Sequence, residues 1–501
     1  MFAFIVLILF LFQCYPSFAA PTAYLASEYI IVRDANNQTA VTTAKRGWVS
    51  SPNERGTIDI IWSSLITMFL CSWSLLCLNV PAPKHSILSR LHLRLWLTAL
   101  CFLGPEFTLV MALGQYASAR QSVIDFANAK AGDWTMNHAF YANMGGFMLH
   151  TPDFAPFPVD AKQLLFLIKG GFVELPKLQK RAIADKNKVD GMLRLITLLQ
   201  VLWFTINVIG RIATRLTVTC LELTTAAFII CAVGTSYCWL HKPADVEVPE
   251  DIYSSHSIVE IEKAAWEAAK SDPTIDPNVS REIQTRTPLD FLSRKEWAWS
   301  KYWTNWINIL RNMKIVFAPK QFPVDRFENT VFLPLPKSLY TIWSLIALAY
   351  SSIFVAAWNF EFPTPIERTL WHIATLGLLV SAVAYWVITH FAYDAWPSIR
   401  SWLSSHLPEM SSRIQKKREA SINTRLGRKL HKLADMLRNN SPNKDPALTI
   451  PLKAILPIYV LGVLYCTSRT YILLADIVEL RSLPADAFEQ VDWSVFVPHF
   501  H

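Results

Sequence analysis

Seven apolar runs of about 20 residues set the strongest limit on what this chain can fold into. They cover residues 58–80, 95–115, 192–210, 218–240, 338–358, 369–390 and 454–474. An α-helix rises about 1.5 Å per residue, so about 20 apolar residues are needed to cross the hydrocarbon core of a bilayer. Only 17% of the residues are charged, where a soluble chain has about 25%. We therefore expect an all-α integral membrane protein embedded in the lipid bilayer.

The second run, 95–115, differs from the others because Gly104, Pro105 and Glu106 interrupt its middle. A proline removes a backbone hydrogen bond from a helix, and a lone glutamate at mid-depth in lipid is costly. A re-entrant or in-plane helix that other helices shield relieves both problems. We therefore predict six transmembrane helices plus one re-entrant or in-plane helix at 95–115. A kinked full crossing, which gives seven crossings, is the alternative.

The distribution of basic residues favours six crossings. If the chain starts outside, the hydrophilic segments 81–191, 241–337 and 391–453 lie in the cytoplasm and hold 37 of the 47 lysine and arginine residues. Positive charge is enriched on cytoplasmic flanks, although this rule weakens for loops as long as these. A seventh crossing would place most of the positive charge outside. Arg211 and Arg215, in a short outer turn, do not follow the trend.

The N-terminus has the pattern of a secretory signal peptide. An apolar core within residues 1–19 is followed by small residues at the cleavage position. Cleavage leaves 20–57 as a lumenal or extracellular segment, in which Asn37 begins a glycosylation sequon. The sequons at Asn278 and Asn439 fall in predicted cytoplasmic segments. We therefore predict a multi-pass glycoprotein that enters the secretory pathway and resides in the plasma membrane or an endomembrane.

The apolar and hydrophilic segments together predict the domain organisation. It comprises a first membrane region at 58–240, a cytoplasmic loop at 241–337, a second membrane region at 338–390, a basic cytoplasmic loop at 391–453, a last transmembrane helix at 454–474 and a C-terminal tail at 475–501. No internal repeat is visible among these regions.

Two stretches of the cytoplasmic loops are predicted to form amphipathic helices. In 288–317, Trp299, Trp303 and Trp306 recur at helical spacing. Such a stripe suits either the headgroup boundary of the membrane or packing on the protein's own cytoplasmic domain. In 422–438, leucines at helical spacing oppose arginines and lysines. Anionic lipid is a candidate contact for this second helix, and an ordinary solvated basic face is the alternative.

Three charged residues inside the apolar runs form a candidate intramembrane polar site: Glu106, Glu222 and Arg469. Glu222 and Arg469 lie at matching depths near the ends of their helices, so a Glu222–Arg469 pair is the simplest prediction. Asp476 and Asp59 are competing partners. Such a pair forms either a polar pathway or a structural clamp, and the clamp is favoured. For Glu106, binding of a proton or cation and simple capping of the helix break are equally compatible.

No pattern of a known catalytic or cofactor site occurs in the sequence. Phosphate-binding glycine loops and the serine-hydrolase elbow are absent, and the histidines lack the spacing of a metal site. The eight cysteines fall in apolar segments without a CxxC pair, so packing is their expected role. Basic cytoplasmic loops explain the net charge of +8 without nucleic acid. We predict no catalytic residue, no metal and no cofactor.

Four stretches resemble a known family. They are AWNFEFPTPIERTLWHIATL (357–376), LELTTAAFIICAVGTSYCWLHKP (221–243), DKNKVD (185–190) and RSLPADAFEQVDWSVFVPHF (481–500). Together they resemble a large family of fungal polytopic membrane proteins that has no assigned activity. His372 stands where the family pattern has arginine. The resemblance implies a fungal source and a membrane location, and it transfers no functional residue.

Two functions of different classes follow from these features. In the first, the protein moves or senses a small solute or ion, because it has carboxylates at membrane depth. In the second, it is a membrane-anchored scaffold or accessory factor, because its cytoplasmic segments are long and contain amphipathic helices. A membrane-embedded enzyme ranks third, since isolated histidines and aspartates from different helices can form a site. The first function is favoured.

Overall fold

The structure is a computed structural model that describes most of the chain. The described residues are 30–33, 39–42, 45–50, 55–82, 86–176, 183, 191–271, 287–294, 297–313, 324–329, 331–406, 424–441 and 444–493. The predicted signal peptide at 1–19 and the sequons at Asn37 and Asn278 lie outside them.

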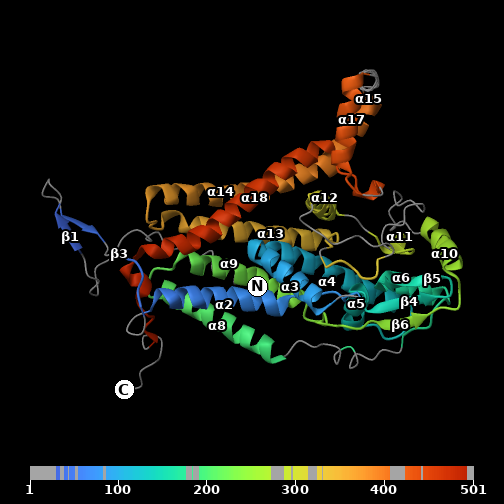
Figure 1. The fold of residues 1–501 in the computed structure, drawn as a ribbon, viewed down its shortest axis with the longest axis horizontal. Helices are drawn as coiled ribbons and strands as arrows, with labels where there is room; N and C mark the ends of the chain where they lie inside the picture. Colours follow the sequence, from blue (N-terminus) through green and yellow to red (C-terminus); the bar gives the residue numbers. More distant parts are fainter. Residues whose placement is uncertain are drawn as a thin grey trace.

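The described chain is mostly helical. Its longest apolar helices form a bundle of α2 (Thr57–Leu75), α8 (Gly191–Ala213), α9 (Cys220–Cys238), α13 (Lys337–Ile353), α14 (Pro365–His390) and α18 (Leu452–Val478), shown side by side in Figure 1. By length and composition, six described helical stretches are able to cross a membrane, or seven if a bent pair counts as one span. Each coincides with a predicted apolar run. The prediction of a multi-pass helical architecture is therefore confirmed at this level.

The outward faces of these helices are apolar. Trp62 on α2, Leu199 on α8 and Ile373 on α14 are exposed large hydrophobic side chains, and many others accompany them. A soluble protein rarely exposes so much contiguous apolar surface. Contact with lipid accounts for it, because hydrocarbon chains are as apolar as leucine.

The bent pair coincides with the interrupted run. α3 (Ile87–Leu103) and α4 (Pro105–Asn128) meet at Gly104 with a bend of 112°. Proline fits the first turn of α4 because no helical partner is lost there. A Cβ at Gly104 would lie 2.5 Å from the Phe107 ring, so the break requires glycine. The break occurs where the sequence predicted it, and α4 continues well beyond the apolar run.

The prediction of an all-α fold is wrong in one region. A three-stranded sheet of order β5-β4-β6 lies at one end of the bundle (Figure 1). Its strands are β4 (Phe147–Thr151), β5 (Phe154–Val159) and β6 (Glu250–Tyr253), and α5 (Met136–Asn143), α6 (Ala161–Lys169) and α10 (Ile258–Ser271) accompany it. β5 pairs antiparallel with β4, and β6 pairs parallel with it. The sequence analysis predicted loops for these residues. It missed the strands because β4 and its parallel partner β6 lie about 100 residues apart in the chain.

Two further short strand pairs and five short helical turns complete the described chain. The strands are β1 (Ile30–Arg33) with β2 (Thr39–Thr42), and β3 (Lys45–Arg46) with β7 (Leu483–Pro484). Single helical turns cover Phe354–Asn359, Phe391–Ala395, Pro446–Leu448, Glu479–Arg481 and Ala485–Phe488. The β3–β7 pair joins the segment before α2 to the segment after α18.

The tryptophan-rich stretch forms α11 (Asp290–Ser293) and α12 (Ala298–Asn312). The Trp299 ring packs against Phe107, Trp343 and Tyr385 of three bundle helices or their extensions. Asn305, on the buried side of α12, donates to the Leu437 carbonyl at 3.3 Å. Of the two predicted environments, the structure therefore shows packing on the protein itself.

The basic stretch forms α17 (Arg425–Arg438), which projects from the body beside α15 (Trp396–His406), as Figure 1 shows. Its leucine face is not covered by the described residues: Leu426 is 70% exposed and Leu430 is 56% exposed. The predicted amphipathic helix is thus present, with its apolar side open.

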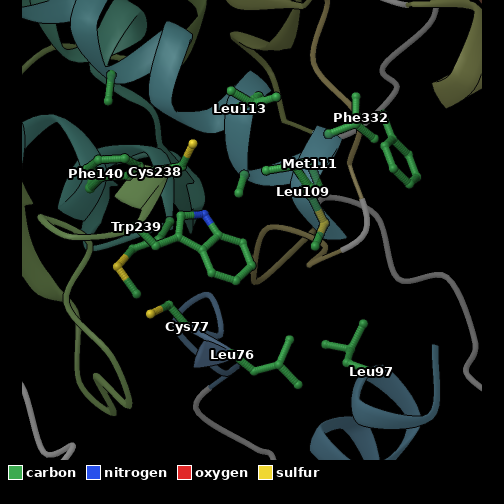
Figure 2. Packing of buried hydrophobic residues seen from close by; sticks show 14 of the residues in the cluster. Leu76, Cys77, Leu97, Leu109, Met111, Leu113, Phe140, Cys238, Trp239 and Phe332 are labelled. Atoms are coloured by element: carbon green, nitrogen blue, oxygen red, sulfur yellow. The ribbon is translucent and has the colours of Figure 1, made fainter. Parts of the chain in front are cut away.

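A continuous apolar core joins the bent pair to the bundle. Figure 2 shows Trp239, at the end of α9, with Cys77 from the segment after α2 and Leu109 and Met111 from α4 gathered around it. All four are buried. This packing fixes α4 against α9 and thereby positions the residues that follow Gly104 inside the bundle.

Candidate intramembrane polar site

The bend at Gly104 creates the site because it leaves a backbone carbonyl without its helical partner. The Leu103 carbonyl oxygen, just before the bend, accepts a hydrogen bond from Arg469 Nε at 3.1 Å and from the Tyr465 hydroxyl at 3.4 Å. Both side chains come from α18. A broken helix in lipid needs such partners, since an unpaired carbonyl there is costly. α18 is therefore bonded to the bend between α3 and α4.

Glu106 lies two residues after Gly104, in the first turn of α4, and is only 6% exposed. Its Oε1 accepts a hydrogen bond from the Tyr465 hydroxyl, and its Oε2 has no hydrogen-bond partner among the described residues. Its backbone carbonyl accepts from Trp343 Nε1 of α13 at 3.4 Å. The carboxyl group is thus held by a single phenol within a closed helical interface.

Arg469 is fully buried, at 0% exposure, in the middle of the bundle. Its Cζ lies 5.1 Å from the centroid of the Phe354 ring and 5.6 Å from that of Tyr350, at cation–π distance. In the part of the chain that the structure describes, its Nη1 and Nη2 atoms have no hydrogen-bond partner. No described carboxylate lies within 4 Å of the guanidinium. Aromatic faces, rather than a direct ion pair, surround this charge.

Two further carboxyl groups follow Arg469 along the chain. Asp476 comes 7 residues later, two turns along the same face of α18, and Glu479 lies in the helical turn directly after α18. Asp476 is fully buried, and no described residue lies at hydrogen-bond distance from either of its carboxyl oxygens. Glu479 accepts a hydrogen bond from the Cys220 backbone N–H at 3.0 Å. We call Glu106, Tyr465, Arg469, Asp476 and Glu479 the polar column.

The structure does not form the predicted Glu222–Arg469 pair. Glu222 instead pairs with Arg55, and its Oε2 accepts from the Thr219 backbone N–H and hydroxyl at 3.0 Å each. Glu222 occupies the third position of α9, where a capping box turns the carboxylate back towards its own helix end. Arg55 comes from the segment before α2, and sequence spacing gave no sign of that proximity.

Arg211 has a structural role that explains why it did not follow the charge distribution. It is buried, and its guanidinium donates to the carbonyls of Thr217, Asp486, Ala487 and Glu489 at 2.7 to 3.1 Å. These carbonyls belong to the turn after α8 and to the segment after α18. Arg211 therefore ties the chain end to the bundle, so its position says little about topology.

A further buried cation, Lys242, lies just beyond the other end of α9. Its Nζ donates to Gln115 Oε1 at 2.9 Å and to Asn79 Oδ1 at 3.2 Å. Gln115 Oε1 also accepts from Trp239 Nε1 at 3.0 Å. Burial disfavours the charged form and lowers the pKa of Lys242 to about 8, with a smaller opposing effect from Cys77.

The polar column includes residues that charge counting alone did not select. Tyr465 and Glu479 were not among the candidates, and Asp476 was considered only as a partner for Arg469. The available signal was spacing: residues 465, 469, 476 and 479 all fall on one face of a helix. Within the described residues, no group of three His, Cys, Asp or Glu side chains is placed to hold a metal ion.

The fold and the site define a polytopic helical membrane protein with a charged interior. The chain matches a family of unknown function (DUF8562) at residues 25–260 and 336–430, which is more than half of its length, and it belongs to that family. The matched residues include α4 and α9 but not α18. No curated protein and no solved structure matches the chain. The resemblance to a fungal membrane family stays a prediction.

Proposed function

We propose that the protein moves or senses a small solute or ion through the polar column. The observation that supports this is the contrast between two sets of buried charges in one bundle. Glu222 and Arg211 have their polar atoms bonded within the protein, as structural charges do. Arg469 and Asp476 are buried equally deeply, yet four of their polar atoms have no hydrogen-bond partner in the described part of the chain. Buried charged groups without hydrogen-bond partners at membrane depth are typical of transport or sensing sites.

For the membrane topology, we propose six crossings, with α3 and α4 forming a re-entrant pair entered from the cytoplasmic side. A bend above 90° turns α4 back towards the side from which α3 came, which supports this arrangement. Asn439 is buried and its amide donates to the Asp445 carbonyl at 2.6 Å, so a glycan cannot attach there without local unfolding.

We also propose that the chain enters the secretory pathway and that residues 1–19 are cleaved from it. A glycosidase-sensitive sugar mapped to Asn37 is its test.

The functional test is Glu106→Gln in the purified full-length protein reconstituted into liposomes. Light scattering follows vesicle swelling after transfer into iso-osmolar potassium chloride, potassium acetate or glycerol. Wild type is expected to accelerate swelling in at least one probe solute or to shift its thermal unfolding midpoint in one. Glu106→Gln should reduce that response by roughly tenfold or more, because its amide cannot exchange a proton or match a carboxylate.

The matched control for this test is Glu260→Gln, on the exposed side of α10. Its response should equal that of wild type. A wild-type protein that responds to none of the probe solutes, by swelling or by unfolding midpoint, would count against transport and sensing alike.

We further propose that α17 lies on an anionic membrane surface. Its leucine face is open, its other side has Arg428, Lys429 and Lys432, and α18 starts 13 residues after it at Leu452. An apolar face beside basic groups at the end of a membrane helix is complementary to acidic headgroups.

Hydrogen exchange of residues 425–438 in nanodiscs tests this contact. Protection should rise when phosphatidylserine replaces phosphatidylcholine, and the double variant Lys429→Glu/Lys432→Glu should lose the rise. Equal protection from exchange in phosphatidylserine and phosphatidylcholine would refute the contact with anionic lipid. It would indicate that α17 binds a protein partner or no partner.

A scaffold function receives less support from the structure. The tryptophans of α12 were the main candidate surface for partners, and Trp299 and Trp303 pack against the protein's own core. α17 and α15 remain exposed, so a scaffold role depends on them. A membrane-embedded enzyme stays the third possibility, with no residues to assign to it.

A further inference from the structure

We propose that the ion bound and passed by the polar column is the proton. This inference rests on the proposed function and names the chemical species at the same site. Its basis is a charge imbalance: the column contains three carboxyl groups, those of Glu106, Asp476 and Glu479, and one guanidinium, that of Arg469, which interacts with Glu106 and Asp476.

The charge balance requires bound protons. If all three carboxyls were ionised, the column would hold a net charge of −2 in a dry interior. Burying one uncompensated charge is already costly, and a buried group takes up a proton instead. A neutral column therefore has one carboxylate opposite Arg469 and protons on the other two groups. The negative charge can move from one of the three carboxyl groups to another as protons exchange between them. Proton transfer along the column requires this exchange.

Among the described residues, the groups around the column add no positive charge that would balance its carboxyl groups besides Arg469. From the neighbouring elements, the titratable groups near the column are Cys101 of α3, Cys220, Glu222 and Cys231 of α9, and Tyr350 of α13. None of these groups is a cation. Two arginines lie near Glu222, but Arg55 is paired with Glu222 itself, and Arg211 interacts with Glu222, Asp486 and Glu489. These arginines therefore do not balance the charge of the column's carboxyl groups.

The geometry provides steps between the carboxyl groups. Arg469 interacts electrostatically with both Glu106 and Asp476. The Tyr465 hydroxyl is bonded to Glu106, and the Thr224 hydroxyl lies near Asp476. From Tyr465 to Asp476 the helix rises about 17 Å, which is about half of a 30 Å hydrocarbon core. Glu479 follows in the helical turn directly after α18.

Other cations fit the site poorly. Sodium, potassium or calcium need about six oxygen ligands gathered around one point, whereas these carboxyls are spread along a helix face.

Infrared difference spectroscopy tests proton binding without any transport assay. The full-length protein in lipid is titrated from about pH 5 to about pH 9, across the ordinary range of perturbed carboxyl groups. We expect the carbonyl stretch of protonated carboxyls to be present at neutral pH and to lose components in Glu106→Gln and in Asp476→Asn. A spectrum at neutral pH that lacks protonated carboxyls sensitive to these substitutions would overturn the proposal.

A flux assay in liposomes tests whether protons pass through the protein. Liposomes that contain the protein, potassium and a pH-sensitive dye receive valinomycin, and the dye follows the proton movement driven by the potassium gradient. Wild type should show flux, Glu106→Gln and Asp476→Asn should slow it by roughly tenfold or more, and Glu260→Gln should not. Absence of wild-type flux overturns the proton assignment. If the swelling response in potassium chloride, potassium acetate or glycerol persists in that case, the proposed function survives with another substrate.

Discussion

Replacing Arg469 with methionine should lower the free energy of unfolding by about 3 to 5 kcal/mol at neutral pH, the loss typical of breaking a buried charge network. Methionine keeps the apolar stem but leaves the place of the guanidinium beside Tyr350 and Phe354 unfilled, so lost packing contributes a part of the loss that does not depend on pH. The remainder comes from the carboxyls of Glu106 and Asp476, which keep their burial but lose the positive charge near them. The Leu103 carbonyl also loses its donor. Denaturant or thermal unfolding of the purified protein in detergent measures the change.

The pH dependence of this loss distinguishes charge from packing. Acid protonates the carboxyls that methionine leaves without a counter-charge, so the difference between variant and wild type should shrink as the pH falls from about 8 to about 5. Arg469→Lys retains a charge and should lose less. As a control, Arg481→Met removes an exposed arginine that pairs with Glu367, and about 1 kcal/mol or less is expected. An Arg469→Met protein as stable as wild type at every pH would show that the buried charge is not needed for the fold.

The membrane helices were predictable from sequence because lipid imposes a length and a composition that few other structures satisfy. The position of the break in 95–115 was predictable for a related reason, since Gly104 and Pro105 both oppose a continuous helix. The sheet of β4, β5 and β6 was not. Its parallel pairing joins segments about 100 residues apart that lie in polar stretches, where hydrophobic periodicity gives little information.

The candidate site was predictable only in part, and the reason is that charged residues were ranked by depth rather than by helix face. Depth matched Glu222 with Arg469, but a capping box and Arg55 hold Glu222 elsewhere. The face of α18 relates Arg469 to Tyr465 and Asp476, which spacing alone predicts. The contact between that face and Glu106 depends on how the bend at Gly104 packs in three dimensions, and no local pattern reveals it.

Lys242 should make the protein more stable as the pH rises, which is unusual for a group that forms hydrogen bonds. Its pKa is about 8 in the folded protein, against a usual value of 10.5. Between these two pH values the unfolded chain binds more protons than the folded one, so the free energy of unfolding increases with pH in that window. The shift of about 2.5 pH units corresponds to about 3 kcal/mol. Below pH 8 both states are protonated, and the full cost of burying the charge is present.

The measurement compares wild type with Lys242→Met from about pH 7 to about pH 10. Methionine has nearly the same length but no titratable group, so the comparison cancels the titration of every other residue. The stability of wild type relative to Lys242→Met should rise by about 2 to 3 kcal/mol over this range. Lys169→Met, at an exposed position near the end of α6, should show a constant difference. A constant difference for Lys242→Met as well would mean that Gln115 and Asn79 solvate the ammonium group well enough to offset its burial, and that the segment after α9 tolerates a permanent charge.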